Sequence, residues 1–158
     1  MPRSAGKEKR SDMDGLAAGL QELINSEERA TFPPRVLAEA HHPRNVGRLQ
    51  NADARASFKG PCGDTMEFYL RIASGRVKKI SFMTDGCGAS IATGSMLTRL
   101  VSGKSLKAAA ALTENRLLEA LGGLPKEHRH CAKLAVTTLR MALAGYTDTK
   151  KKTKSGRK

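Results

Sequence analysis

Alternation between apolar and polar positions predicts three β-strands in the middle of the chain. It is clearest over 65–73, where the apolar residues Met66, Phe68, Leu70 and Ile72 alternate with the polar residues Glu67, Tyr69 and Arg71. This is the pattern of a strand with one buried face. Ser74-Gly75 separates this run from the next and is a hairpin signal. We predict strands over Ala54–Gly60, Thr65–Ala73 and Val77–Thr84.

Helical spacing of apolar residues precedes and follows this block. Pro33-Pro34 opens one helix, since proline suits a first turn, and His42-Pro43 ends it. We predict helices over 15–29, 35–41, 90–102, 106–111 and 115–121, and a long C-terminal helix over 125–144. Strands followed by helices indicate an α+β fold, a small antiparallel three-stranded sheet packed against helices.

The net charge of +13 is distributed unevenly. Residues 1–31 carry −1, 32–149 carry +8, and 150–158, which contain no acid, carry +6. We therefore predict a mobile N-terminal extension with a short helix over 1–31, one folded domain over 32–147, and a disordered basic tail over 148–158. Only 4% of residues are aromatic and Trp is absent, which argues against nucleic-acid binding, because nucleic-acid readers commonly interleave bases with stacking rings.

The sequence also predicts the cellular compartment of the protein. No apolar run approaches the roughly 20 residues of a membrane helix, and the N-terminus has no apolar signal region. Three cysteines do not make a disulfide framework. We expect a cytoplasmic protein with no membrane partner.

All three cysteines lie where one predicted element gives way to another. Cys62 is in the loop between the first two strands, Cys87 in a glycine-flanked strand-to-helix turn, and Cys131 near the start of the last helix. A helix N-terminus lowers the pKa of a nearby thiol, so we expect reactive thiolates at Cys87 and at Cys131, which lies among basic residues. Asp64 and His130 are the nearest further donors, and three sulfurs plus one nitrogen or oxygen suit zinc or an iron–sulfur cluster.

Four ordered motifs resemble the IscU/NifU-type iron–sulfur cluster assembly scaffolds. They are His42-Pro43-Arg44-Asn45-Val46-Gly47, Cys62-Gly63-Asp64, Gly86-Cys87-Gly88-Ala89-Ser90 and His130-Cys131, and the likeness spans about residues 33–146. The resemblance implies a non-enzymatic scaffold that accepts sulfur from a cysteine desulfurase, takes iron and electrons from an iron donor and a ferredoxin, builds a [2Fe–2S] cluster and transfers it to apoproteins.

By that resemblance, Cys62, Cys87 and Cys131 are cluster ligands, and Cys131 also receives the persulfide sulfur. Asp64 is the exchangeable ligand that keeps the cluster labile, and His130 is an alternative ligand. Adjacent residues on a regular helix diverge by about 100°. His130 and Cys131 therefore face one metal only if the helix begins there, and we expect the two to alternate as ligands.

The sequence departs from the family pattern at one partner motif. Members served by a dedicated Hsp70 chaperone carry Leu-Pro-Pro-Val-Lys before the His-Cys pair, whereas Leu124-Pro125-Lys126-Glu127-His128 stands here. This argues against that chaperone. The chain also shows no second Cys-x-x-Cys domain, so we do not expect a full-length NifU.

Competing interpretations keep the same residues and change the chemistry. A zinc-dependent, SufU-like sulfurtransferase would use the site to position one thiol for persulfide, and zinc could also fill the site of an isolated scaffold. Three other histidines are expected to be ordinary exposed residues: His41, His42 and His128.

Overall fold

The computed structural model describes residues 5–155, which divide into two units between Phe32 and Pro33. The first unit consists of helix α1 (Ala5–Thr31), whereas a helix was predicted only over 15–29. Helix growth adds one hydrogen bond per ordered residue, and the Lys, Glu and Arg residues of this segment are good helix formers. The apolar side chains of α1 are exposed: Met13, Leu16, Leu20, Leu23 and Ile24.

The second unit is built on the predicted three-stranded antiparallel sheet. Its strands are β1 (Ala54–Lys59), β2 (Thr65–Ala73) and β3 (Arg76–Thr84), in the order β1-β2-β3. Ser74 and Gly75 both have positive φ, 54° and 69°, as the tightest hairpin turns require. The register places Phe68 opposite Phe82 and Leu70 opposite Ile80, so the buried side chains line one face.

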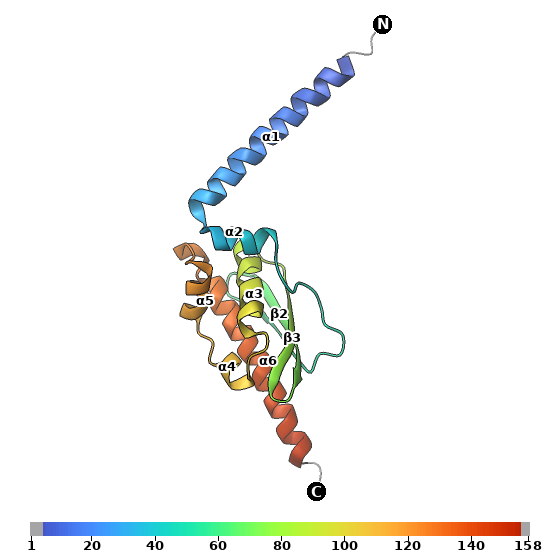
Figure 1. The fold of residues 1–158 in the computed structure, drawn as a ribbon, viewed down its shortest axis with the longest axis vertical. Coiled ribbons are helices and arrows are strands. Elements are labelled where there is room, and N and C mark those ends of the chain that lie inside the picture. Colours follow the sequence, from blue (N-terminus) through green and yellow to red (C-terminus); the bar gives the residue numbers. More distant parts are fainter. Residues whose placement is uncertain (1–4, 156–158) are drawn as a thin grey trace. The chain divides into compact units, whose positions relative to one another are not determined.

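Helices cover this apolar face, which confirms the predicted α+β fold (Figure 1). They are α3 (Gly88–Val101), which packs on β3, and α6 (His130–Ser155), which packs on β1 and β2. Gly94 allows α3 its close approach, since a Cβ there would lie 2.5 Å from the Phe82 ring. The smaller helices are α2 (Pro34–His41), α4 (Leu106–Ala110) and α5 (Glu114–Leu121).

The long last helix begins and ends later than predicted. A 3-10 turn, η1 (Lys126–His128), occupies the segment expected to be the first helical turn, and α6 starts at His130. At the other end α6 continues to Ser155, through residues 148–155 that were expected to be unstructured. Lysine is a good helix former, and cations are favoured at a helix C-terminus. The rest of the predicted disordered tail, 156–158, lies outside the described residues.

The segment with the His-Pro-Arg-Asn motif docks between β3 and α3. Backbone bonds join it to the strand: Phe82 N–H donates to the Asn45 carbonyl (3.0 Å), and Gly47 N–H donates to the Phe82 carbonyl (2.9 Å). The Asn45 amide donates to Thr98 of α3 at 3.0 Å. Buried Glu39 of α2 accepts hydrogen bonds from Ser95 and Arg99 of α3. These contacts fix the position of α3, and with it the turn that carries Cys87.

None of the helices in residues 5–155 combines the length and the hydropathy needed to cross a membrane.

Candidate metal centre

Three separate elements bring the cysteines together at one end of the sheet. Cys62 lies in the β1–β2 loop, Cys87 is the N-cap residue of α3, and Cys131 is the second residue of α6. The strands β1 and β2 hold the loop at this end, and α3 and α6 begin here. Residues far apart in sequence therefore meet through the fold rather than through a local motif.

The loop that carries Cys62 and Asp64 is a tight turn. Gly60 N–H donates to the Asp64 carbonyl at 2.9 Å, and Gly63 N–H donates to the Gly60 carbonyl at 3.0 Å. Gly63 has a φ of +92°, a conformation that suits glycine. Cys62 is exposed and Asp64 is half-buried. The turn thus presents two donors, one sulfur and one carboxylate, from positions two residues apart.

The turn before Cys87 is fixed by hydrogen bonds to the ends of β2 and β3. Asp85 Oδ1 accepts from Thr65 N–H at 2.6 Å, and Gly86 N–H donates to Thr84 Oγ1 at 3.1 Å. Asp85 therefore helps to form the turn that leads to Cys87. A Cβ at Gly86 would lie 2.5 Å from Ser90 Oγ and 2.9 Å from Asp64 Oδ2. Only a residue without a side chain leaves room here for both polar groups.

The start of α6 presents two adjacent residues to the same site. His130 Nε2 lies 3.7 Å from Cys131 Sγ. His130 is the first residue of the helix, which is the condition under which the two residues can face one metal. This geometry does not by itself require the two to alternate as ligands, and their alternation stays a prediction.

The side-chain donors form two groups of three. Cys62, Asp64 and His130 make one group, and Cys87, His128 and Cys131 make the other. Within each group, one ligand atom from every residue lies within 4.8 Å of those of the other two. All five residues predicted for the site belong to these groups. The sixth donor, His128, was expected to be an exposed histidine, but it is half-buried beside two cysteines.

Ser90 connects the two groups from the first turn of α3. Its side chain is fully buried, and its Oγ lies 3.2 Å from Asp64 Oδ2 and 3.4 Å from Cys131 Sγ. Its role was not predicted, although its position three residues after Cys87 places it in the first helical turn. Groups of this kind orient metal ligands and tune them.

Cys131 is the least accessible of the three thiols. It is fully buried, whereas Cys62 and Cys87 are exposed. Burial, opposed by the Ser90 hydrogen bond and reinforced by the charges of Cys87, Asp64 and Cys62, raises the pKa of Cys131 to about 11. The expected thiolate at Cys131 is therefore wrong for the metal-free protein, because desolvation outweighs the start of the helix. A bound metal would reverse this, since coordination deprotonates a thiol.

This donor set suits soft or borderline metals. Thiolate and imidazole ligands favour zinc and iron–sulfur clusters over magnesium or calcium. His41 and His42, by contrast, belong to neither group, and both are exposed as expected.

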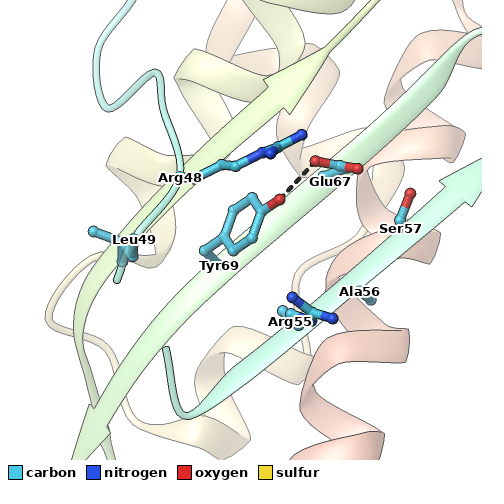
Figure 2. Close-up of a pocket in the computed structure, with 7 residues that line it drawn as sticks. All are labelled: Arg48, Leu49, Arg55, Ala56, Ser57, Glu67 and Tyr69. Atoms are coloured by element: carbon cyan, nitrogen blue, oxygen red, sulfur yellow. Dashed lines mark hydrogen bonds between the residues drawn. The ribbon is translucent and has the colours of Figure 1, made fainter. Parts of the chain in front are cut away.

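A separate cavity of about 540 Å³ lies on the other face of the sheet (Figure 2). Tyr69 donates to Glu67 at 2.7 Å within it, and Arg48 and Arg55 lie on either side. Burial, together with the Glu67 contact, raises the pKa of Tyr69. The cavity lining contains neither cysteine nor histidine, so the cavity is distinct from the metal centre.

Comparison with known proteins supports the resemblance seen in the motifs. The sequence matches the family model of the NifU-like N-terminal domain over residues 31–153. It is 40% identical over 116 residues to the iron–sulfur cluster assembly scaffold protein IscU 1 of Archaeoglobus fulgidus, covering 73% of this chain and 76% of that protein. Identity to the Aquifex aeolicus IscU scaffold is 38% over 118 residues, covering 73% and 75% of the two chains.

Solved structures with the same fold are more distant in sequence. A NifU-like N-terminal protein from Brucella abortus has a TM-score of 0.59 at 23% identity, covering 73% of this chain and 94% of that one. FiSufU from Fervidobacterium islandicum has a TM-score of 0.61 at 18% identity, covering 71% and 96%. These two likenesses concern the fold alone.

Proposed function

The chain belongs to the NifU-like N-terminal domain family, and from that premise we propose that it is a scaffold on which a [2Fe–2S] cluster is assembled and passed to apoproteins. The observation that carries the proposal is the convergence of three sulfurs, one carboxylate and two imidazoles on one end of the sheet. Relatives that align with most of this chain are named iron–sulfur cluster assembly scaffold proteins.

The proposed ligands have different roles because their donor atoms differ in chemical softness and in solvent accessibility. Cys62, Cys87 and Cys131 supply the thiolates that iron–sulfur clusters prefer. Asp64 supplies a harder oxygen ligand, which binds iron less tightly than sulfur and so leaves the cluster exchangeable. His130, beside both Asp64 and Cys131, offers a neutral replacement when Asp64 leaves.

Sulfur arrives, in this proposal, as a persulfide on a cysteine desulfurase. The Cys131 thiol loses its proton and its sulfur attacks the outer sulfur, the desulfurase S–S bond breaks, and the desulfurase thiolate leaves and takes up a proton. Electrons from iron and from a ferredoxin then reduce the transferred sulfur to sulfide. Because Cys131 is fully buried, transfer requires the site to open when the desulfurase docks. An iron donor and recipient apoproteins complete the set of partners.

The test is anaerobic reconstitution with iron, a cysteine desulfurase and cysteine. Sulfur-to-iron charge-transfer bands and about equal counts of iron and acid-labile sulfide are expected. A Cys131→Ser variant should fail to accept labelled sulfur from the desulfurase, while Cys62→Ser should still accept it. A wild-type protein that stays colourless would contradict the scaffold function.

A zinc-dependent sulfurtransferase is the second candidate function. It is favoured by the donor types at the centre, since zinc binds cysteine sulfur, histidine nitrogen and carboxylate oxygen, and each group holds at least one sulfur and one imidazole. The same reconstitution separates the two functions: a protein that keeps zinc and acquires only persulfide is the sulfurtransferase, and one that builds a cluster after zinc removal is the scaffold.

A further inference from the structure

His128 lies in the second donor group with Cys87 and Cys131, next to the group of Cys62, Asp64 and His130. We propose that His128 is a metal ligand and that the centre binds two divalent cations side by side before sulfide arrives, one in each group. This inference rests on the proposed scaffold function and adds to it a second cation and a residue with no role in the motifs.

The spacing within each group allows coordination with small side-chain rotations. Metal–sulfur bonds of about 2.3 Å and metal–nitrogen bonds of about 2.0 Å place tetrahedral ligands roughly 3.5–3.8 Å apart. The ligand atoms of Cys87, His128 and Cys131 already lie within 4.8 Å of one another. Closing the remaining distance needs shifts of about 1 Å or less in the side chains, and Cys87 is exposed.

The backbone places His128 for this role. Its N–H donates to the Pro125 carbonyl at 2.8 Å in the 3-10 turn that precedes α6. The turn brings His128 to the site, half-buried, three residues before the buried Cys131. A regular helix from Pro125, as predicted from sequence, would have set a different angle between these two residues.

The two donor groups also suit an order of assembly in which two irons bind first and sulfide is added second. Each group provides three donors, which leaves one position of a tetrahedral metal open. An iron of a [2Fe–2S] cluster keeps two protein ligands, because two positions go to the bridging sulfides. One donor must therefore leave from each group, and His128 is the neutral leaving ligand in the Cys87–Cys131 half.

Anaerobic titration of the reduced 158-residue chain with Co²⁺ tests this inference, because sulfur-to-cobalt charge-transfer bands report thiolate ligation. We expect the wild type to saturate at two equivalents and His128→Gln to saturate at one. His41→Gln, which alters a histidine outside the two groups, should keep two equivalents. Far-ultraviolet circular dichroism checks that each variant is folded.

A wild type that saturates at one equivalent, or a His128→Gln variant that still binds two, would overturn the inference. Cluster reconstitution in the same preparations separates this failure from failure of the scaffold function. A protein that builds a cluster but binds one Co²⁺ keeps its scaffold function and loses the second cation. A protein that binds two Co²⁺ but builds no cluster keeps the second cation and loses the scaffold function.

Discussion

Ser90 Oγ lies 3.4 Å from Cys131 Sγ, although 41 positions separate the two residues in the sequence. Each residue lies in the first turn of its helix, Ser90 in α3 and Cys131 in α6. The contact is fully buried, and the same hydroxyl lies 3.2 Å from Asp64 Oδ2. It joins the two helices that cover the sheet at the point where the metal ligands meet.

Removing this hydroxyl should weaken metal binding more than folding. Ser90→Ala deletes the group that orients both Asp64 and Cys131, and changes of this kind commonly cost about 10- to 100-fold in metal affinity. Zinc competition against a chromophoric chelator measures the loss. The control is Ser57→Ala, which alters an exposed serine on β1 and should leave the zinc affinity unchanged. Equal zinc affinities for the two variants would show that Ser90 does not orient the metal ligands.

The two glycines that flank Cys87 should differ sharply in tolerance. A Cβ at Gly86 would lie 2.5 Å from Ser90 Oγ and 2.9 Å from Asp64 Oδ2, whereas one at Gly88 would meet Ala40 at an ordinary 3.7 Å. The nearest atoms all belong to side chains of the site, namely Ser90 Oγ, Ser90 Cβ and Asp64 Oδ2, so Gly86→Ala disturbs the site directly. We expect about a tenfold or larger loss of zinc affinity for Gly86→Ala, and near-wild-type affinity for Gly88→Ala.

These two variants make a stringent pair, because each changes one neighbour of the same cysteine. Zinc competition measures the affinity, and thermal unfolding checks the fold. Similar losses in both variants would mean that backbone freedom around Cys87, rather than the space beside Asp64 and Ser90, is what the glycines provide.

Much of the fold could be predicted from sequence because it rests on local periodicity. The strict alternation in 65–73 and the Ser74-Gly75 turn determine the central hairpin, and the observed β2 has the predicted bounds. The start of α6 could not be predicted in this way. Nothing in the local pattern distinguishes a 3-10 turn over Lys126–His128 from a first helical turn, and the difference depends on packing.

The same distinction holds for the metal centre. Cys62 and Cys87 could be predicted as site residues from their glycine neighbours and from their positions between predicted elements, and both signals are local. The burial of Cys131 depends on how α6 packs against β1 and β2, which no neighbouring residue reveals. His128 was missed for that reason too, although its spacing of three from Cys131 was a signal that could have identified it.

The raised pKa of Cys131 predicts how the metal-free thiols react. With a pKa of about 11, only about one molecule in a thousand carries the Cys131 thiolate at about pH 8. Alkylation by iodoacetamide should therefore be much slower at Cys131 than at exposed Cys62 and Cys87. Its rate should rise with pH until the thiol ionises, as mass-spectrometric peptide mapping over a pH series will show.

The Ser90 hydrogen bond favours the thiolate, so it lowers the pKa that burial raises. Ser90→Ala should therefore slow alkylation of Cys131 further and leave the other two thiols unaffected. A Cys131 that reacts as fast as Cys87 in the wild type would contradict the buried position.

Cluster lifetime should depend on the ligand at position 64. Asp64→Ala removes the oxygen ligand that we expect to exchange, so a reconstituted cluster should persist longer, and Asp64→Cys should prolong it most by completing a four-cysteine set. Decay of the visible absorption in the presence of a chelator gives the lifetimes.

Asp85→Asn is the control for charge, because it removes a nearby carboxylate yet keeps an oxygen that can accept a hydrogen bond from Thr65 N–H. If Asp85→Asn prolongs the lifetime as much as Asp64→Ala does, local charge governs cluster release; if Asp64→Ala holds no cluster, Asp64 is a required ligand rather than the exchangeable one.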